Sequence, residues 1–367
     1  MAHQLPLSTY HRIRHDAAIL IVSGLILGGV AGCQQDGSST TSQATAFQNI
    51  INEPLASEPW EFSGIPGVKI TSAHYVVYTT IRSPVYQRLL LKVLEKDYDR
   101  FAKLVDIQPA PASAAAPATS GATRTAHAPL ECYVFGDRPQ WEFFTRKRMP
   151  QNSDTYLRIG AGGYAQEGVF VGYDLGRETT LSVIAHEAWH QYSWFAFKDK
   201  LPSFLEEGLA TQNEAIEWTG TTPSYAPARN LQRYRSLREA IINKRLWTLD
   251  ELARTHAGQA VQRQETVTAA YYAQVWSFTL FLKQSPVYRP KFLDMIKRAH
   301  EGRLHEALGN FRAASLQMFT ENWNSVVGPA YLRAYINPDL AALEKEYRQF
   351  LSELVHEWPP KTANPEF

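Results

Sequence analysis

The chain is poor in cysteine, has almost no net charge and lacks an apolar run long enough to cross a membrane. Two cysteines in 367 residues, Cys33 and Cys132, cannot build the disulfide framework that stabilises many small secreted domains. The longest apolar run, residues 17–31, is shorter than the ~20 residues of a transmembrane helix. With 37 basic and 36 acidic residues, the composition gives no support to nucleic-acid binding. Stability must therefore come from a hydrophobic core.

The first 32 residues have the organisation of a bacterial lipoprotein signal peptide. Arg12 and Arg14 precede the apolar run, which ends in Val30-Ala31-Gly32-Cys33. This string resembles a lipobox, in which the cysteine is lipidated and becomes the new N-terminus. We therefore expect removal of residues 1–32 and lipid on Cys33, which would anchor the chain in the cell envelope on the extracytoplasmic side. An ordinary secretory signal or an uncleaved anchor is the alternative.

Two further segments lack the pattern of folded elements. Residues 33–59 begin with a stretch rich in Ser, Thr, Gln and Gly, and we expect them to form a flexible tether. Residues 108–129 are almost wholly Pro, Ala, Ser and Thr, which predicts a disordered insertion. The remainder divides into an expected α/β lobe over residues 60–198 and a mainly helical lobe over residues 199–367.

Strands are expected first and helices later. β-branched and aromatic residues predict strands over 72–80 and 130–136, the second with Cys132 as a small core residue, and a hairpin over 162–173. Ser83-Pro84 predicts the start of a helix that runs to about residue 105. Such an order is typical of an α+β fold. Further helices are expected over 140–147, 228–245, 249–254, 268–282, 288–300 and 340–355.

The string His186-Glu187-Ala188-Trp189-His190 carries the most chemical information. On a helix, residues four apart lie on one face, so both imidazoles can reach a single ion while Glu187 projects beside them. A catalytic zinc site has three nitrogen, sulfur or oxygen ligands from the protein and an open position, so a third ligand is needed. Thr179 or Thr180 is the expected N-cap of this helix. Its expected apolar face comprises Leu181, Ile184, Ala185, Ala188, Trp189, Tyr192 and Phe195.

A second helix is expected to start after Pro202 and to supply the third ligand. Ser203 and Glu206 have the spacing of a capping box, so Glu206 is expected to cap this helix. Glu207 is then the carboxylate free to point at the metal. A histidine that binds a metal usually donates a hydrogen bond from its other ring N–H to a partner. Thr211 or Glu214 could be that partner.

The string from His186 to His190 has the form HExxH. Together with the second helix it resembles the gluzincin metallopeptidases, the thermolysin-like class. The matching residues of that helix are Phe204-Leu205-Glu206-Glu207-Gly208-Leu209-Ala210. The resemblance covers about residues 67–300 and is closest to bacterial lipoprotein peptidases of this class without an assigned substrate. It implies an α+β, gluzincin-like fold with a small N-terminal mixed sheet, a mainly helical C-terminal lobe and a zinc site between them. Two features depart from the family: the gap from His190 to Glu207 is short, and Thr211 stands where many relatives have an acidic residue.

The resemblance also implies zinc-dependent hydrolysis of peptide bonds. His186, His190 and Glu207 would hold Zn2+, and Glu187 would be the general base. The hairpin over 162–173 would bind an extended peptide along its edge, although an ordinary capped edge is the alternative. Tyr272, or else Tyr271, would stabilise the oxyanion, and three histidines are weaker competitors: His256, His300 and His305.

We expect the substrate to be a peptide or protein cut internally, because the sequence has no motif that resembles those recognising a free N-terminal amine. The chain is expected to be a monomer. An alternative function is that of a catalytically silent surface protein that keeps the gluzincin scaffold and binds peptide or envelope partners, and the intact Glu187 argues against it. Another hydrolysis, such as deacylation, would use the same zinc ion and base.

Overall fold

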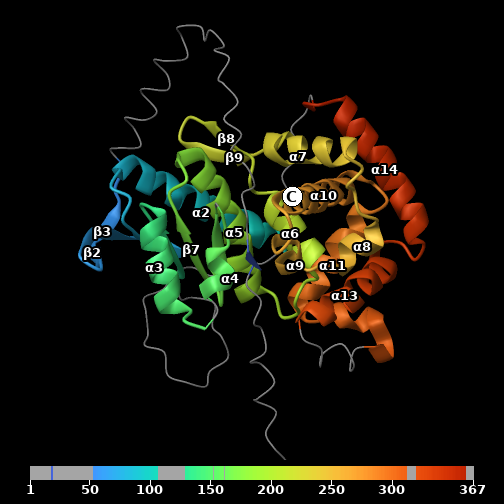
Figure 1. Ribbon diagram of the computed structural model, residues 1–367, viewed down its shortest axis with the longest axis horizontal. Coiled ribbons are helices and arrows are strands. Elements are labelled where there is room, and N and C mark those ends of the chain that lie inside the picture. Colours follow the sequence, from blue (N-terminus) through green and yellow to red (C-terminus); the bar gives the residue numbers. More distant parts are fainter. Residues whose placement is uncertain are drawn as a thin grey trace, which may run out of the picture.

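The computed structural model describes residues 18–19, 53–105, 129–151, 153–160, 162–311 and 320–360 (Figure 1). Most of the expected signal peptide, Cys33, most of the tether and all but the last residue of the expected insertion over 108–129 lie outside these residues. The described chain is an α+β protein, with a mixed sheet first and a mainly helical part after it. Sheet and helical part lie on opposite sides of Figure 1.

The sheet has the strand order β1-β6-β7-β5-β4-β3-β2. Neighbouring strands are parallel from β4 through β5 to β7 and antiparallel elsewhere. The strands expected over 72–80 and 130–136 and the hairpin are confirmed, but the β2–β3 hairpin was not foreseen. The strands are β1 (Ala18–Ile19), β2 (Ala56–Phe62), β3 (Ile65–Thr71), β4 (Tyr75–Thr79), β5 (Leu130–Phe135), β6 (Gly163–Gln166) and β7 (Val169–Tyr173).

Strand β1 pairs with the outer edge of β6. Ala18 lies opposite Ala165 and Ile19 opposite Tyr164, in antiparallel register. Ala18 and Ile19 belong to the segment that is expected to be removed as a signal peptide.

Two long helices cover one face of the sheet, and α3 (Arg138–Arg148) packs on the strands from the other side. Helix α2 (Pro84–Leu104) starts as expected, with Pro84 in its first turn and the Ser83 side chain accepting the Tyr86 N–H. It packs along α5 (Arg177–Ala196), which follows directly after the β6–β7 hairpin. The short α4 (Ser153–Leu157) contacts α3.

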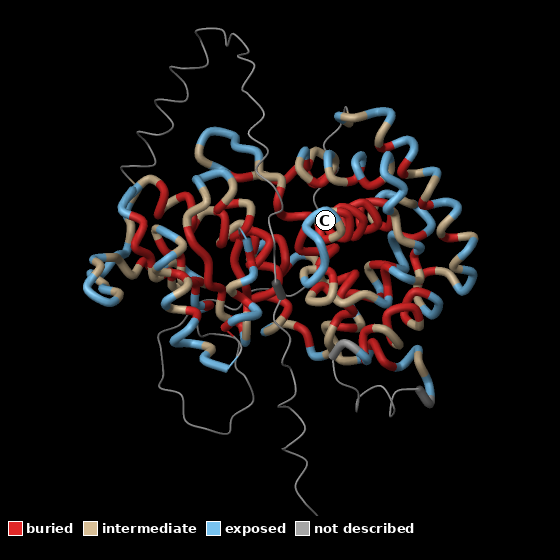
Figure 2. Tube along the Cα trace, viewed as in Figure 1, coloured by how far each residue is buried: buried red, intermediate tan, exposed pale blue. Residues whose placement is uncertain are grey.

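The helical part is built around α10 (Glu265–Gln284), which is buried along most of its length (Figure 2). It packs against α6 (Ser203–Thr211) and α7 (Leu231–Ile242). Around them lie α8 (Leu249–Arg254), α9 (Ala257–Val261), α11 (Arg289–Glu301), α13 (Thr320–Tyr331) and α14 (Leu340–His356), with short 3-10 or π turns at 227–229, 304–311 and 332–336. The expected helices are confirmed, α8 with the expected bounds and the others with shifted ends, whereas α9 and α13 were not foreseen.

A small hairpin, β8 (Ile216–Thr219) and β9 (Thr222–Tyr225), lies where only helices were expected. It turns at Gly220, whose φ of +61° is the left-handed conformation that glycine adopts without steric cost. One hydrophobic cluster joins the two parts of the protein, because side chains of the sheet, of α5, of α6 and of α10 all belong to it. None of the helices in the described ranges is both long and apolar enough to span a membrane.

Candidate metal centre

Helix α5 carries the HExxH string and is buried on almost every side. It begins at Arg177 after Gly176, which has a φ of +88° and provides no side-chain cap. The expected N-cap at Thr179 or Thr180 is therefore wrong, because both residues lie inside the helix. The Thr180 hydroxyl instead accepts the Leu175 N–H and donates to the Gly176 carbonyl. Phe195, expected on the buried face, is 45% exposed.

Helix α6 shows that the expected capping box is also wrong. Its N-cap is Pro202, without a side-chain hydrogen bond, and Ser203 is already its first residue. The Ser203 hydroxyl accepts the Ala257 N–H at 2.9 Å and contacts the Tyr271 hydroxyl. Glu206 turns towards α5, where its Oε1 atom accepts hydrogen bonds from His190 Nδ1 at 3.0 Å and from the Ser193 hydroxyl at 2.5 Å. The Glu206 carboxylate therefore bonds two side chains of α5 and does not cap α6.

Three ligand atoms from the two helices meet at one point. Glu207 Oε2 lies 3.3 Å from His186 Nε2 and 3.6 Å from His190 Nε2. The three residues are buried, and each offers one atom within 4.8 Å of the other two. Within the described chain, none of the three atoms has a hydrogen-bonding partner. Buried polar atoms are nearly always satisfied, so this group fits a cation as the missing partner.

The other ring nitrogens of the two histidines strengthen this fit. His186 Nδ1 lies 2.8 Å from Glu214 Oε1, just as His190 Nδ1 bonds Glu206. A carboxylate accepts hydrogen bonds, so each Nδ1 carries a proton and each Nε2 is the ring atom left to face an ion, which would take the place of a second proton on the ring. Glu214 is thus the partner of His186, whereas the Thr211 hydroxyl bonds the Gly208 carbonyl of its own helix. Two imidazole nitrogens and one carboxylate oxygen are a donor set that suits zinc.

The charges of the group shift its pKa values. Burial acts to raise the pKa of Glu207, but His190 and His186 outweigh it and lower the pKa to about 2. Burial acts to lower the pKa of His190, but Glu207 and Glu206 raise it well above its ordinary value. The carboxylate of Glu207 is therefore ionised at neutral pH and ready to bind a cation.

Glu187 lies beside this group and is fully buried. Neither of its carboxylate oxygens makes a hydrogen bond of ordinary geometry in the described structure. Burial raises its pKa to about 7, although the nearby His190 and His186 act to lower it. A carboxyl group with such a pKa can both accept and release a proton near neutral pH.

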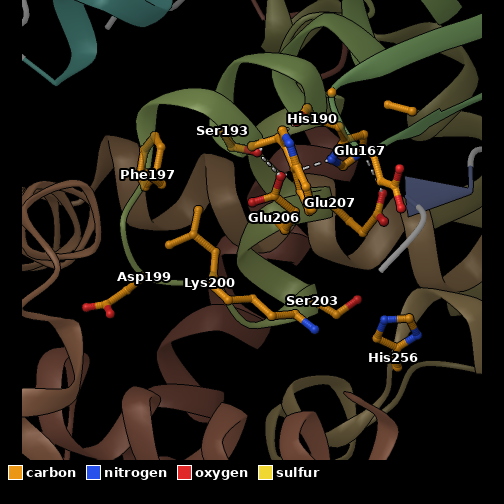
Figure 3. A pocket seen from close by; sticks show the side chains of 14 residues that line it. Glu167, His190, Ser193, Phe197, Asp199, Lys200, Ser203, Glu206, Glu207 and His256 are labelled. Atoms are coloured by element: carbon orange, nitrogen blue, oxygen red, sulfur yellow. Dashed lines mark hydrogen bonds and ion pairs between the residues drawn. The ribbon is translucent and has the colours of Figure 1, made fainter. Parts of the chain in front are cut away.

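A pocket opens beside Glu207 and His190 (Figure 3). Glu206 also lines it, and His256 and Ser203 lie across from these residues. His256 Nδ1 accepts the Gly258 N–H at 3.0 Å and so caps α9, which leaves Nε2 to carry the ring proton. The sequence contains a signal for this cap, because Gln259 stands three positions after His256 and bonds its backbone N–H. The other lining residues are Ala165, Glu167, Gly168, Ser193, Trp194, Phe197, Asp199, Lys200 and Leu201.

The two tyrosines expected to stabilise the oxyanion are both fully buried on α10. Tyr271 contacts Ser203 through its hydroxyl, and Tyr272 places its ring 6.1 Å from that of His186. His300 bonds the Ala196 carbonyl, and His305 contacts Tyr331, so these histidines belong to the packing of the helical part. Neither tyrosine lines the pocket beside Glu207, and neither do His186 and Glu187, whereas His256 does.

No protein-family model matches the chain, and no curated protein is similar to it.

Proposed function

We propose that the protein is a zinc-dependent metallopeptidase of the gluzincin type, attached by a lipid anchor outside the cytoplasm. The observation that carries the proposal is the convergence of three buried, unpartnered ligand atoms from α5 and α6 beside a second buried carboxylate, that of Glu187. The zinc site would lie where the helix after the sheet meets the first helix of the helical part. The signal sequence and Cys33 support the anchor.

His186, His190 and Glu207 would hold the ion. A bound zinc ion would supply Lewis acidity, which polarises a substrate carbonyl and lowers the pKa of water from near 16 to about 7. Glu187 would take a proton from the attacking water and pass it to the departing amine. One carboxyl group would thus serve both halves of the reaction.

His256 is the side chain that we assign to the substrate's carbonyl oxygen. Its Nδ1 atom is occupied by the cap of α9, so Nε2–H is the donor that it offers in the pocket. Burial, together with Lys200, lowers the pKa of His256 to about 4, so the ring is neutral at physiological pH. A fixed donor of this kind stabilises negative charge that develops on the carbonyl oxygen. His256 thereby replaces Tyr272 and Tyr271 as our preferred candidate.

The edge of β6 would align the substrate. Ala165, which lines the pocket, lies on this strand. Strand β1 pairs with this edge, and because Ala18 and Ile19 belong to the expected signal peptide, its removal would leave the edge open to an extended substrate. A peptide bound there would be held through backbone hydrogen bonds, which suits substrates of varied sequence. This favours a peptide or protein over a small molecule as the substrate.

Cleavage of a mixed peptide library by the zinc-loaded protein, and by its Glu187→Gln variant, tests the proposal. We expect turnover by the wild type and a loss of about 100-fold to 10,000-fold in the variant, the usual contribution of a general base. The zinc content should be equal in both, because Glu187 is not a ligand. Binding of peptides by the zinc-loaded wild type without cleavage would support the silent-scaffold alternative, and equal turnover by both proteins would refute the role of Glu187.

A further inference from the structure

The carboxylate behind His186 is saturated with hydrogen bonds. Glu214 Oε1 accepts from His186 Nδ1 at 2.8 Å and from Arg233 Nη2 at 2.6 Å. Its Oε2 atom accepts from Arg233 Nε at 2.7 Å and from Asn230 Nδ2 at 2.8 Å. A carboxylate has about four acceptor positions, so Glu214 has no free one and can adopt only this orientation.

Arg233 reaches this carboxylate from a helix that contributes no metal ligand. It lies in the first turn of α7, is only 2% exposed, and grips Glu214 with two parallel N–H bonds. Asn230 also helps to hold the Glu214 carboxylate. Its side-chain oxygen caps α7 by accepting the Arg233 N–H, and its amide group donates to Glu214. The guanidinium carbon also lies 5.0 Å from the centre of the Tyr272 ring, which packs on His186.

The carboxylate behind the other histidine is held quite differently. Both hydrogen bonds that Glu206 accepts, from His190 and from Ser193, go to Oε1. The Glu206 side chain is 21% exposed and lines the pocket, and no arginine is paired with it in the described structure. One ligand histidine is therefore fixed from behind by a closed network, whereas the partner of the other faces the substrate side.

We propose that Arg233 is a positioning residue of the metal centre. It holds Glu214, and through Glu214 the ring of His186, so that His186 Nε2 points at the ion's position before the ion arrives. This inference rests on the proposed function in so far as zinc is the ion. A buried carboxylate without a counter-charge is costly, and Arg233 provides that charge when no cation is bound. Lysine cannot replace it fully, because an ammonium group lacks the planar fork that engages both oxygens.

Zinc affinity, measured by competition with a chelator at fixed pH, tests this role without any need for turnover. We expect Arg233→Met to bind zinc about 10-fold to 100-fold more weakly than the wild type, the usual effect of losing a group that orients a ligand. Arg233→Lys should fall between the two. Asn230→Ser keeps a cap for α7 but removes one of the four donors, so a loss of a few-fold is expected. Arg229→Met, at an exposed ion pair with Glu217, is the matched control and should leave affinity unchanged.

A double-mutant cycle separates positioning from a general effect on stability. In a Glu214→Ala background, Arg233→Met should cause little further loss of zinc affinity, because the side chain that links Arg233 to His186 is absent. Equal losses in both backgrounds, or affinity within threefold of the wild type in the single variant, would overturn the proposal. If Arg233→Met does not fold, Arg233→Lys and Asn230→Ser decide by the same criterion, with wild-type affinity in both counting against it. A wild type that binds zinc but cleaves nothing would refute only the peptidase function.

Discussion

At the scale of single residues, the candidate metal centre depends on two adjacent glutamates, Glu206 and Glu207, which have different roles. Glu207 Oε2 lies near His190 Nε2 and would bind the ion, whereas Glu206 accepts a hydrogen bond from Nδ1 on the other side of the ring. We expect Glu207→Ala to abolish tight zinc binding, because it removes a ligand. Glu206→Ala should weaken binding by about 10-fold to 100-fold through His190, although the sequence alone predicts an effect mainly on helix stability. Zinc titration checks both.

The exposed Glu178 in the first turn of α5 provides the control, since Glu178→Ala leaves the whole centre in place. Wild-type affinity in Glu206→Ala would mean that the hydrogen bond to His190 does not matter. Affinity equal to that of Glu207→Ala would mean that Glu206 can itself act as a ligand.

The two ring nitrogens of His256 can be tested separately. His256→Ser keeps a side chain that caps α9 but removes the donor in the pocket, so we expect kcat to fall about 100-fold or more while the melting temperature stays near that of the wild type. His256→Gln keeps an N–H donor of similar reach and should recover part of the activity. Steady-state kinetics and thermal melts check these outcomes. If kcat in His256→Ser stays within threefold of the wild type, His256 is not the donor.

The sequence revealed those site residues that have a short, regular spacing. His186, Glu187 and His190 form one motif. The structure brings Glu207 together with the two histidines, as predicted, but the ground for choosing it, that Glu206 caps the helix, is wrong. Glu214 was only one of two options, since it lies in the loop after α6. Arg233 could not be recognised: Arg235 and Arg238 share its helix, and only the burial of Arg233 against Glu214 sets it apart.

At the scale of elements, the position of Glu207 depends on close packing between α6 and α10. A Cβ atom on Gly208 would lie 2.2 Å from Thr279 Oγ1 and 3.2 Å from the Val275 carbonyl. Gly208→Ala should therefore push α6 away from α10 and destabilise the protein by about 1–3 kcal/mol, with weaker zinc binding. Denaturant unfolding and zinc titration check this. In Gly208→Ala/Thr279→Ala the nearest clash is removed, so most of the stability should return, and no recovery would locate the strain elsewhere.

Elements with strong apolar periodicity were predicted well, and polar ones were not. The helix expected over 249–254 has the bounds of α8, and α2 differs from its expectation only at its last residue. The β2–β3 hairpin was missed because β2 is largely exposed and carries two glutamates and a proline. The β8–β9 hairpin was missed because it is short, and its first strand is also mostly exposed. Neither hairpin contributes a side chain to the three ligands.

At the scale of the whole molecule, the order of strands before helices could be read from the sequence. The sequence did not reveal that one hydrophobic cluster joins both parts, because burial between distant segments leaves no local pattern in the sequence. The two helices that carry the ligands lie within this shared cluster. Loss of the ion should therefore affect the stability of the entire fold.

We expect removal of zinc by a chelator to lower the melting temperature by several degrees. A ligand that binds only the folded state contributes about 4 kcal/mol when its free concentration is ~1000 times its Kd. His190→Ala, which cannot complete the ligand set, should melt at the same temperature with and without chelator. A wild type that is equally insensitive, measured by calorimetry, would argue against a tightly held ion.

The position of Cys132 gives the protein an internal reporter. The thiol lies in the middle of the sheet, fully buried and hydrogen-bonded to Gln191, and burial raises its pKa, which disfavours the reactive thiolate. In a protein that carries Cys33→Ser, alkylating reagents would meet this sulfur only when β5 separates from α5. The rate of labelling under native conditions would then measure how often the sheet opens, with and without metal, and no introduced probe would be needed.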